Sequence, residues 1–115
     1  MPAVPPSFKS KEALQALFRP QSVAVIGAST APEKLGYKIF KNILDAGFPG
    51  KVYPINPKAT EILGRPCFPG IDAIPDQVDL AVVIIPAPLV ADTIRQCAKR
   101  GAKGTIVISG GFSET

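Results

Sequence analysis

The chain has 115 residues, of which 46% are hydrophobic, and its mean hydropathy is +0.23. These values predict one folded domain, small for a complete doubly wound sheet, and exclude a disordered chain. Since no apolar run approaches the roughly 18 residues that a membrane-spanning helix needs, we expect no membrane partner. The proline-rich first ten residues lack the basic-then-apolar pattern of a signal peptide, which favours a cytoplasmic location.

Charge and the missing histidine narrow the function further. A net charge of +4 suits an anionic partner, but the 13 Lys and Arg residues are scattered rather than gathered in a stripe with aromatic residues, so nucleic acid is not expected. Two cysteines are too few for a metal site or a disulfide framework. The absence of histidine excludes a phosphohistidine, a Ser-His triad or a histidine metal ligand within this chain. We therefore predict no catalytic and no metal-binding residue.

The first half of the chain predicts two helices and two strands. Residues 1–10 are expected to form a flexible arm, followed by one domain over residues 11–115 that is incomplete at its C-terminus. Apolar periodicity, together with Gly47 at a helix C-terminal cap position, indicates where the elements lie. In chain order they are a helix over Lys11–Phe18, a strand over Ser22–Ile26, a helix over Lys34–Ala46 and a strand over Lys51–Ile55.

The second half of the chain predicts a connection and then a strand, a helix and a strand. Residues 57–78 contain several prolines and glycines and are expected to lie over one edge of the sheet, with a short helical turn at Thr60–Leu63. Six consecutive apolar residues predict a strand over Leu80–Ile85 that is buried on both faces. A helix over Leu89–Arg100 and a strand over Thr105–Ile108 follow. This alternation implies a parallel sheet with crossover helices, a Rossmann-like doubly wound α/β fold.

Small, rigid or polar residues follow each predicted strand. Because ligands of such sheets bind beyond the carboxyl ends of the strands, we expect four segments to meet at one site: Gly27-Ala28-Ser29-Thr30, Asn56-Pro57-Lys58, Pro86-Ala87-Pro88 and Ser109-Gly110-Gly111. The first segment ends an apolar strand at a glycine and precedes a helix. That arrangement offers backbone N–H groups and a helix N-terminus to a phosphate, so a nucleotide is the expected ligand.

The first two segments argue against a nicotinamide dinucleotide. Such a site has glycines at the third and sixth positions counted from Gly27, where this chain has Ser29 and Pro32. It also has an acidic residue after the second strand to hold a ribose hydroxyl, where this chain has Asn56. Lys58 would instead suit a 3′-phosphorylated ribose or a diphosphate, and Lys34 could supply a second cation.

The chain resembles the N-terminal CoA-binding domain of the NDP-forming acyl-CoA ligases. These include ADP-forming acetyl-CoA synthetases and the more distant succinyl-CoA synthetase α-subunits. The resemblance runs over nearly the whole chain from about Ser10, and the matching stretches are Leu17–Ser29, Lys34–Gly36, Tyr53–Lys58, Asp79–Ala87 and Ile108–Phe112.

The resemblance implies coenzyme A, or an acyl-CoA, as the ligand. It assigns the CoA phosphates to the loop Gly27, Ala28, Ser29 and Thr30, with Lys34 and Gly36 beside it. It also implies that the adenine nucleotide lies near Asn56, Pro57 and Lys58, that Pro86, Ala87 and Pro88 flank the ligand, and that Ser109, Gly110 and Gly111 lie near the thiol end.

The family relays phosphate through a histidine on a following domain and loads it with an ATP-grasp module, so ATP, ADP and Mg²⁺ are expected only on domains that this chain lacks. By itself the chain is then expected to bind CoA and to catalyse nothing. Two alternatives stay open. One is a regulatory CoA- or nucleotide-sensing domain, including that of a multidomain protein acetyltransferase, and the other is an NAD(P)-binding domain.

Overall fold

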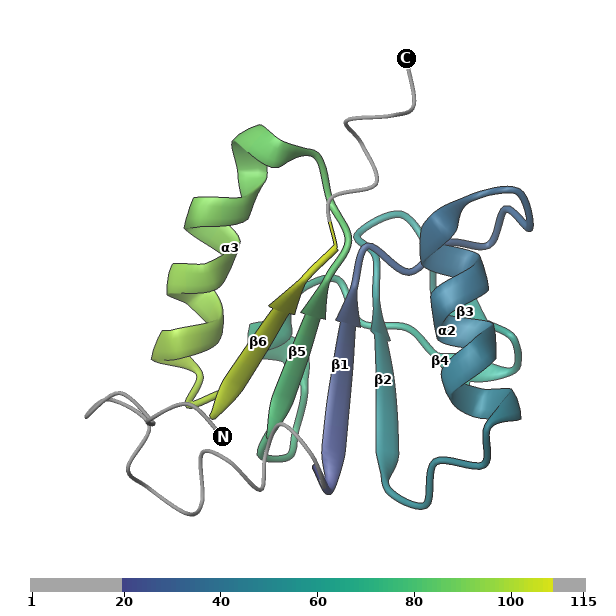
Figure 1. The fold of residues 1–115 in the computed structure, drawn as a ribbon, viewed down its shortest axis with the longest axis horizontal. Helices are drawn as coiled ribbons and strands as arrows, with labels where there is room; N and C mark the ends of the chain where they lie inside the picture. Colours follow the sequence, from purple (N-terminus) through teal and green to yellow (C-terminus); the bar gives the residue numbers. More distant parts are fainter. Residues whose placement is uncertain (1–19, 109–115) are drawn as a thin grey trace, which may run out of the picture.

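The computed structural model describes residues 20–108, which form a parallel sheet with a helix on each face (Figure 1). The order of the four strands is β2-β1-β5-β6. Their bounds are β1 Ser22–Ile26, β2 Lys51–Ile55, β5 Leu80–Val83 and β6 Gly104–Val107. All pairings are parallel, and the chain proceeds outward from β1 to β2 on one side and to β5 and β6 on the other. The predicted Rossmann-like α/β fold is confirmed, with the switch in chain direction at β1.

All four predicted strands are confirmed, and β1 and β2 have the predicted bounds. β5 ends at Val83 instead of Ile85. The reason is that β1 stops at Ile26, whose carbonyl accepts the N–H of Ile84 at 2.7 Å, and the chain then turns at Gly27. Beyond Ile84 the strand therefore has lost its neighbour on that side.

The helices α2 (Leu35–Asp45) and α3 (Ala87–Lys99) lie close to their predicted positions. Each is followed by a glycine with positive φ, 76° at Gly47 and 91° at Gly101, as the left-handed ending of a helix requires. α3 begins two residues earlier than predicted, because Pro88 is accommodated in its first turn, where the missing N–H is not needed. The predicted helix over Lys11–Phe18 and the segment Ser109–Gly111 lie outside the described residues.

The helical turn predicted at Thr60–Leu63 is wrong. Glu61–Ile62 forms β3, which pairs antiparallel with β4 at Arg65–Pro66. The two residues between them, Leu63 and Gly64, have φ values of 51° and 77°. Positive φ at both central residues is the backbone geometry of a tight two-residue hairpin turn, so a hairpin forms in place of the helical turn.

The connection between β2 and β5 covers the outer edge of β2, as predicted. Phe68 forms a parallel bridge with Ile55, donating its N–H to Pro54 and accepting the N–H of Asn56. A short 3-10 helix η2 (Ile71–Ala73) follows and packs Ile71 and Ile74 against the sheet. This segment forms one wall of the cavity described below.

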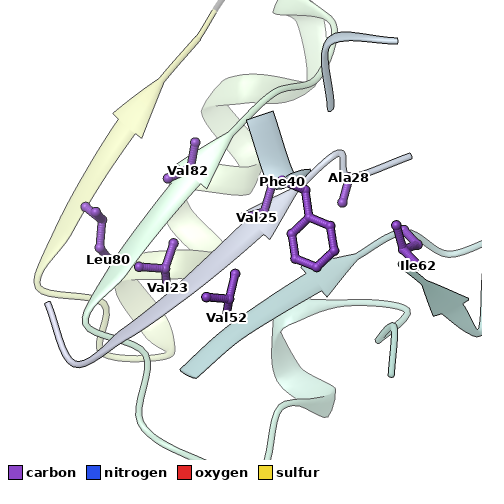
Figure 2. Packing of buried hydrophobic residues seen from close by; sticks show 8 residues of the cluster. All are labelled: Val23, Val25, Ala28, Phe40, Val52, Ile62, Leu80 and Val82. Atoms are coloured by element: carbon purple, nitrogen blue, oxygen red, sulfur yellow. The ribbon is translucent and has the colours of Figure 1, made fainter. Parts of the chain in front are cut away.

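The two faces of the sheet carry separate apolar clusters. On the α2 face, Phe40 is fully buried against Val25 and Val52, and Ile62 of the hairpin closes the same cluster (Figure 2). On the α3 face, Cys97 of α3 is fully buried among Ala24, Ala81 and the residues of the η2 segment. Because successive strand residues point to opposite faces, β1 supplies both clusters.

Two glycines allow a close approach of backbones at the end of β1. A Cβ atom on Gly27 would lie 1.9 Å from the carbonyl oxygen of Ile84, and φ at Gly27 is +99°. A Cβ atom on Gly36, in the first turn of α2, would lie 1.9 Å from the carbonyl oxygen of Gly27. Helix α2 therefore packs directly on the backbone of the loop after β1, which sets the position of that loop.

The opposite end of the sheet is held by side-chain hydrogen bonds around Asp76. Its carboxylate accepts from Lys51 Nζ at 2.8 Å and from the Tyr53 hydroxyl. The hydrogen bond from Lys51, followed by that from Tyr53, lowers the pKa of the Asp76 carboxyl below its ordinary value. Arg100 at the end of α3 donates to the Asp76 carbonyl at 3.0 Å, so this cluster joins β2, α3 and the segment that leads from η2 to β5.

We expect Gly36→Ala to destabilise the fold by about 1–3 kcal/mol, although alanine ordinarily favours a helix. The added methyl group meets the backbone of Gly27, which cannot move as a side chain can. Urea unfolding followed by circular dichroism measures the effect. Gly70→Ala is the matched control, because a Cβ there meets nothing within 4 Å. Equal stability of the two variants would contradict the close packing.

We expect Asp76→Asn to lower the thermal midpoint at pH 7 and to lose that deficit in acid. A carboxyl whose pKa is lowered by folding stabilises the protein above its unfolded pKa of about 4, and this stabilisation is lost as the pH falls through the lower, folded value. Thermal midpoints at pH 7 and pH 3 measure the difference. Asp72→Asn serves as the control, since Asp72 makes no side-chain hydrogen bond to any residue from 20 to 108. A deficit that is as large at pH 3 as at pH 7 would refute the role of the carboxylate.

Candidate functional site

Three of the four predicted site segments lie together at the carboxyl ends of adjacent strands. Gly27–Thr30 follows β1, Asn56–Lys58 follows β2, and Pro86–Pro88 follows β5 and opens α3, at the upper end of the sheet in Figure 1. β1 lies between β2 and β5, so its loop is the centre of the three. The fourth segment, Ser109–Gly111, follows β6 and lies outside the described residues.

The loop after β1 leaves backbone donors open. Gly27 donates its N–H to Ile55 at 3.1 Å, and the Ser29 hydroxyl accepts the N–H of Ala31 at 3.0 Å. Within residues 20–108 the N–H groups of Ser29 and Thr30 have no hydrogen-bond acceptor. Two consecutive free N–H groups in a glycine turn are suited to an anion.

Helix α2 begins beside this loop without a cap of its own. Lys34 precedes the helix, makes no side-chain hydrogen bond to it, and no acidic residue lies in the first turn. A helix N-terminus carries a partial positive charge and free N–H groups. The start of α2 thus offers free donors to a negatively charged group, whose binding here stays a prediction.

Lys34 and Lys58 are the cations of the site. Both side chains are exposed, and neither forms an ion pair with any residue of the described part. Lys58 is the third residue after β2, the strand next to β1, and its N–H is held by Asn56, which also contacts the loop after β1. An unpaired lysine beside open N–H groups adds long-range attraction for phosphates.

Gly36 and Asn56 have structural contacts that the sequence pattern did not indicate. Gly36 is buried against the carbonyl of Gly27. The side-chain amide of Asn56 donates to the carbonyl of Ala28 at 2.9 Å, and its oxygen accepts the N–H of Lys58 at 2.8 Å. Both residues thus contact the predicted phosphate loop or its neighbour.

An apolar cavity of about 240 Å³ opens next to these segments, between the sheet, the η2 segment and α3. Ile26, Ile55, Ile71 and Ile85 form its walls, and Gly27, Asn56 and Pro57 connect it to the strand-end loops. Besides Asn56, its polar side chains are those of Thr93 and Gln96 of α3. Pockets that enclose a whole drug-sized ligand measure roughly 300–1,000 Å³. This cavity is smaller, so it suits one flat ring system of a ligand rather than the whole molecule.

Sequence reasoning missed Thr93, Gln96 and the η2 wall. The sequence did hold a signal for Thr93 and Gln96. They lie three residues apart on one helix and so share a face, and Gln96 precedes the apolar Cys97. Both contact their own helix: the Thr93 hydroxyl donates to the Leu89 carbonyl, and Gln96 Nε2 donates to Asp92. The hydroxyl and carboxamide oxygens can still accept hydrogen bonds.

A cysteine lies next to the candidate site. Cys67 lies beside Asn56, with Sγ 3.6 Å from the Asn56 carbonyl oxygen, and burial raises the pKa of its thiol. A thiol with a raised pKa is a poor nucleophile at neutral pH. Nor do residues 20–108 contain a cluster of three side chains that could hold a metal ion, or a helix long and apolar enough to cross a membrane.

The chain is similar to known proteins over most of its length. The family described as CoA binding domain matches residues 21–115. The acetate–CoA ligase [ADP-forming] II of Archaeoglobus fulgidus is 48% identical over 101 residues, which are 88% of this chain and 15% of that protein. The acetate–CoA ligase [ADP-forming] I subunit alpha of Pyrococcus furiosus is 47% identical over 105 residues, covering 88% of this chain and 23% of the subunit.

Among solved structures, the dinucleotide-forming acetyl-coenzyme A synthetase 1 of Ca. Korarchaeum cryptofilum in its apo form superposes with a TM-score of 0.82 at 48% identity. The matched region is 88% of this chain and 22% of the synthetase. This chain therefore spans less than a quarter of the length of each of these three relatives. The chain belongs to the CoA-binding domain family and is homologous to the N-terminal region of ADP-forming acetate–CoA ligases.

Proposed function

We propose that this chain is the CoA-binding module of an ADP-forming acyl-CoA ligase, and that CoA lies across the carboxyl ends of β2, β1 and β5. One observation carries the proposal: the open N–H groups of Ser29 and Thr30, with no acceptor in the described part of the chain, lie beside an uncapped helix N-terminus and two unpaired lysines. These groups offer several positive partners to phosphates, and CoA carries a diphosphate and a 3′-phosphate.

The parts of CoA match the parts of the site by their chemistry. The diphosphate would bind the Gly27–Thr30 loop and the start of α2, where free N–H groups are available. The 3′-phosphate would bind Lys58, and the cavity lined by the isoleucines would take the adenine ring. The pantetheine arm would then pass Pro86-Ala87-Pro88 toward Ser109-Gly110-Gly111 at the thiol end.

A nicotinamide dinucleotide fits this site less well. The position after β2 holds Asn56, whose carboxamide oxygen already accepts the N–H of Lys58. An acidic side chain that would accept both hydroxyls of an unphosphorylated ribose is missing there. The exposed Lys58 favours a ligand with an additional phosphate on the ribose instead.

The reaction in which such a module takes part interconverts acyl-CoA, ADP and phosphate with the free acid, CoA and ATP. This chain contains no histidine and so offers no phosphohistidine. Its role in the reaction would be to bind CoA and to orient the thioester, and its partners would be a phosphohistidine domain and an ATP-grasp domain, on which ATP, ADP and Mg²⁺ would bind. A cytoplasmic location stays a prediction.

Calorimetric titration of this chain tests the ligand. We expect CoA to bind more tightly than NAD or ADP, because only CoA has both the diphosphate and the 3′-phosphate for Lys58. Dephospho-CoA should fall between CoA and ADP. NAD or ADP binding as tightly as CoA would reject the proposal.

Lys58→Gln tests the assignment of the 3′-phosphate. We expect the variant to lose about threefold to tenfold in affinity for CoA and to bind dephospho-CoA unchanged, as one hydrogen bond to a charged group at an exposed site implies. Lys103→Gln, which removes the same charge from the opposite end of the sheet, is the control and should change neither affinity. An equal loss for both ligands in Lys58→Gln would show that Lys58 does not bind the 3′-phosphate.

A further inference from the structure

Asn56 uses its side chain to join two segments of the candidate site. It is the first residue after β2, and its carboxamide reaches across to the loop after β1, where Nδ2 donates to the Ala28 carbonyl at 2.9 Å. On its other side Oδ1 accepts the N–H of Lys58 at 2.8 Å. The orientation of the amide follows from these partners, since the reverse would face oxygen with oxygen and N–H with N–H.

The main chain of Asn56 is fixed as firmly as its side chain. Its N–H donates to the Phe68 carbonyl at 2.9 Å, which ties it to the strand-like segment outside β2, and its carbonyl accepts the N–H of Ala59 at 3.3 Å. Asn56 is only half buried, so its polar groups could bind water instead of making these contacts. Asn56 therefore links the segment at Phe68 to the loop at Ala28 by hydrogen bonds to both.

The contact with Ala28 determines where the next N–H group points. A trans peptide is planar, and its carbonyl and N–H bonds point in opposite directions. When the Ala28 carbonyl is turned toward Asn56, the N–H of Ser29 must point away from Asn56. Ser29 N–H is one of the open donors of the loop, so the Asn56 amide fixes the direction of a donor that it does not itself touch.

Helix α2 holds the same loop from the other side. Gly36 packs on the Gly27 carbonyl, and Gly27 donates its N–H to Ile55 at 3.1 Å. These contacts fix the two peptides before Ala28, whereas among residues 20–108 the Asn56 carboxamide is the group that donates a hydrogen bond to the peptide after it.

We propose that Asn56 is a positioning residue that aligns the loop after β1 with Lys58, so that the donors for the diphosphate and the cation for the 3′-phosphate are presented together. Asn56 also lines the cavity proposed for the adenine ring, so a readout at the loop itself has to separate positioning from direct contact with the ligand. This inference rests on the proposed function, because the ligand that profits from the alignment is CoA.

The chemistry of the contact explains why an amide is needed. Aspartate at position 56 would keep the acceptor for Lys58 but would face the Ala28 carbonyl with a second oxygen and add a negative charge near the phosphates. Serine is the better probe. Its hydroxyl can accept the N–H two residues later, as Ser29 does from Ala31 at 3.0 Å, but it is too short to reach Ala28. Asn56→Ser thus removes one of the two contacts without changing charge.

The experiment compares wild-type chain, Asn56→Ser and Lys58→Gln in titrations with CoA and with dephospho-CoA. We expect Asn56→Ser to weaken both ligands by the same factor, about threefold to tenfold for one lost hydrogen bond, because both contain the diphosphate. Lys58→Gln is expected to weaken CoA alone. The second readout is the backbone amide order parameter of Ser29 and Thr30 without ligand, from NMR relaxation, which should be lower in Asn56→Ser while that in the centre of β1 is unchanged.

Each outcome decides the point. Unchanged affinity for both ligands in Asn56→Ser, or unchanged order parameters at Ser29 and Thr30, would overturn the positioning role. A loss confined to CoA would also overturn it and would indicate action through the 3′-phosphate alone. Lower order parameters throughout β1 would overturn it too, because the effect would then be a general loss of structure. If wild-type chain binds neither ligand, the proposed function fails, and the order parameters still show whether Asn56 holds the loop.

Discussion

The structure depends on the place where β1 ends, because three backbones meet there without a side chain between them. Gly27 lies against the carbonyl of Ile84 and Gly36 lies against the carbonyl of Gly27, both at distances that exclude a Cβ atom. This close contact ends the pairing of β1 with β5 and turns the chain away from the sheet. It also places the first helical turn of α2 against the loop after β1. The candidate site exists because a strand end, a loop and a helix start are forced into one small volume.

This arrangement satisfies the same physical requirement as a dinucleotide-binding turn with a different glycine spacing. In the familiar pattern the last glycine allows helix and strand to pack closely, and here that role belongs to Gly36, nine residues after Gly27. Ser29 and Pro32 occupy the positions where the usual pattern would have glycines. The longer loop leaves the N–H groups of Ser29 and Thr30 open and adds Lys34 at the helix start, which changes the ligands that the turn suits.

The sequence predicted elements well where local patterns decide them and less well where contacts across the fold decide them. Apolar runs located the four strands of the parallel sheet, and the helices end close to where expected because Gly47 and Gly101 each adopt a positive φ. The β3–β4 hairpin was missed because Leu63 adopts a positive φ, which leucine rarely does and which no local pattern announces. Segments of the site were predicted from their place after strands, but the contact between Asn56 and Ala28 joins residues 28 positions apart. For the same reason the cavity wall of η2 and α3 could not be predicted: it depends on how two segments pack over one face.

The two ends of the sheet differ in how fully their polar groups are paired. At the amino end, Asp76 accepts from Lys51 and Tyr53, and the Ser22 hydroxyl donates to Gln77 and accepts from Asp79, so donors and acceptors are matched within the protein. At the carboxyl end, open N–H groups, an uncapped helix start and two lysines accumulate positive charge, and no carboxylate among residues 20–108 pairs with either lysine. Like charges gathered in one place disfavour the folded state, and an anion that binds only the folded chain offsets this effect by an amount that rises with the logarithm of its concentration above the Kd. The amino end is thus paired internally, whereas the carboxyl end keeps the unpaired donors on which the proposed binding of phosphates depends.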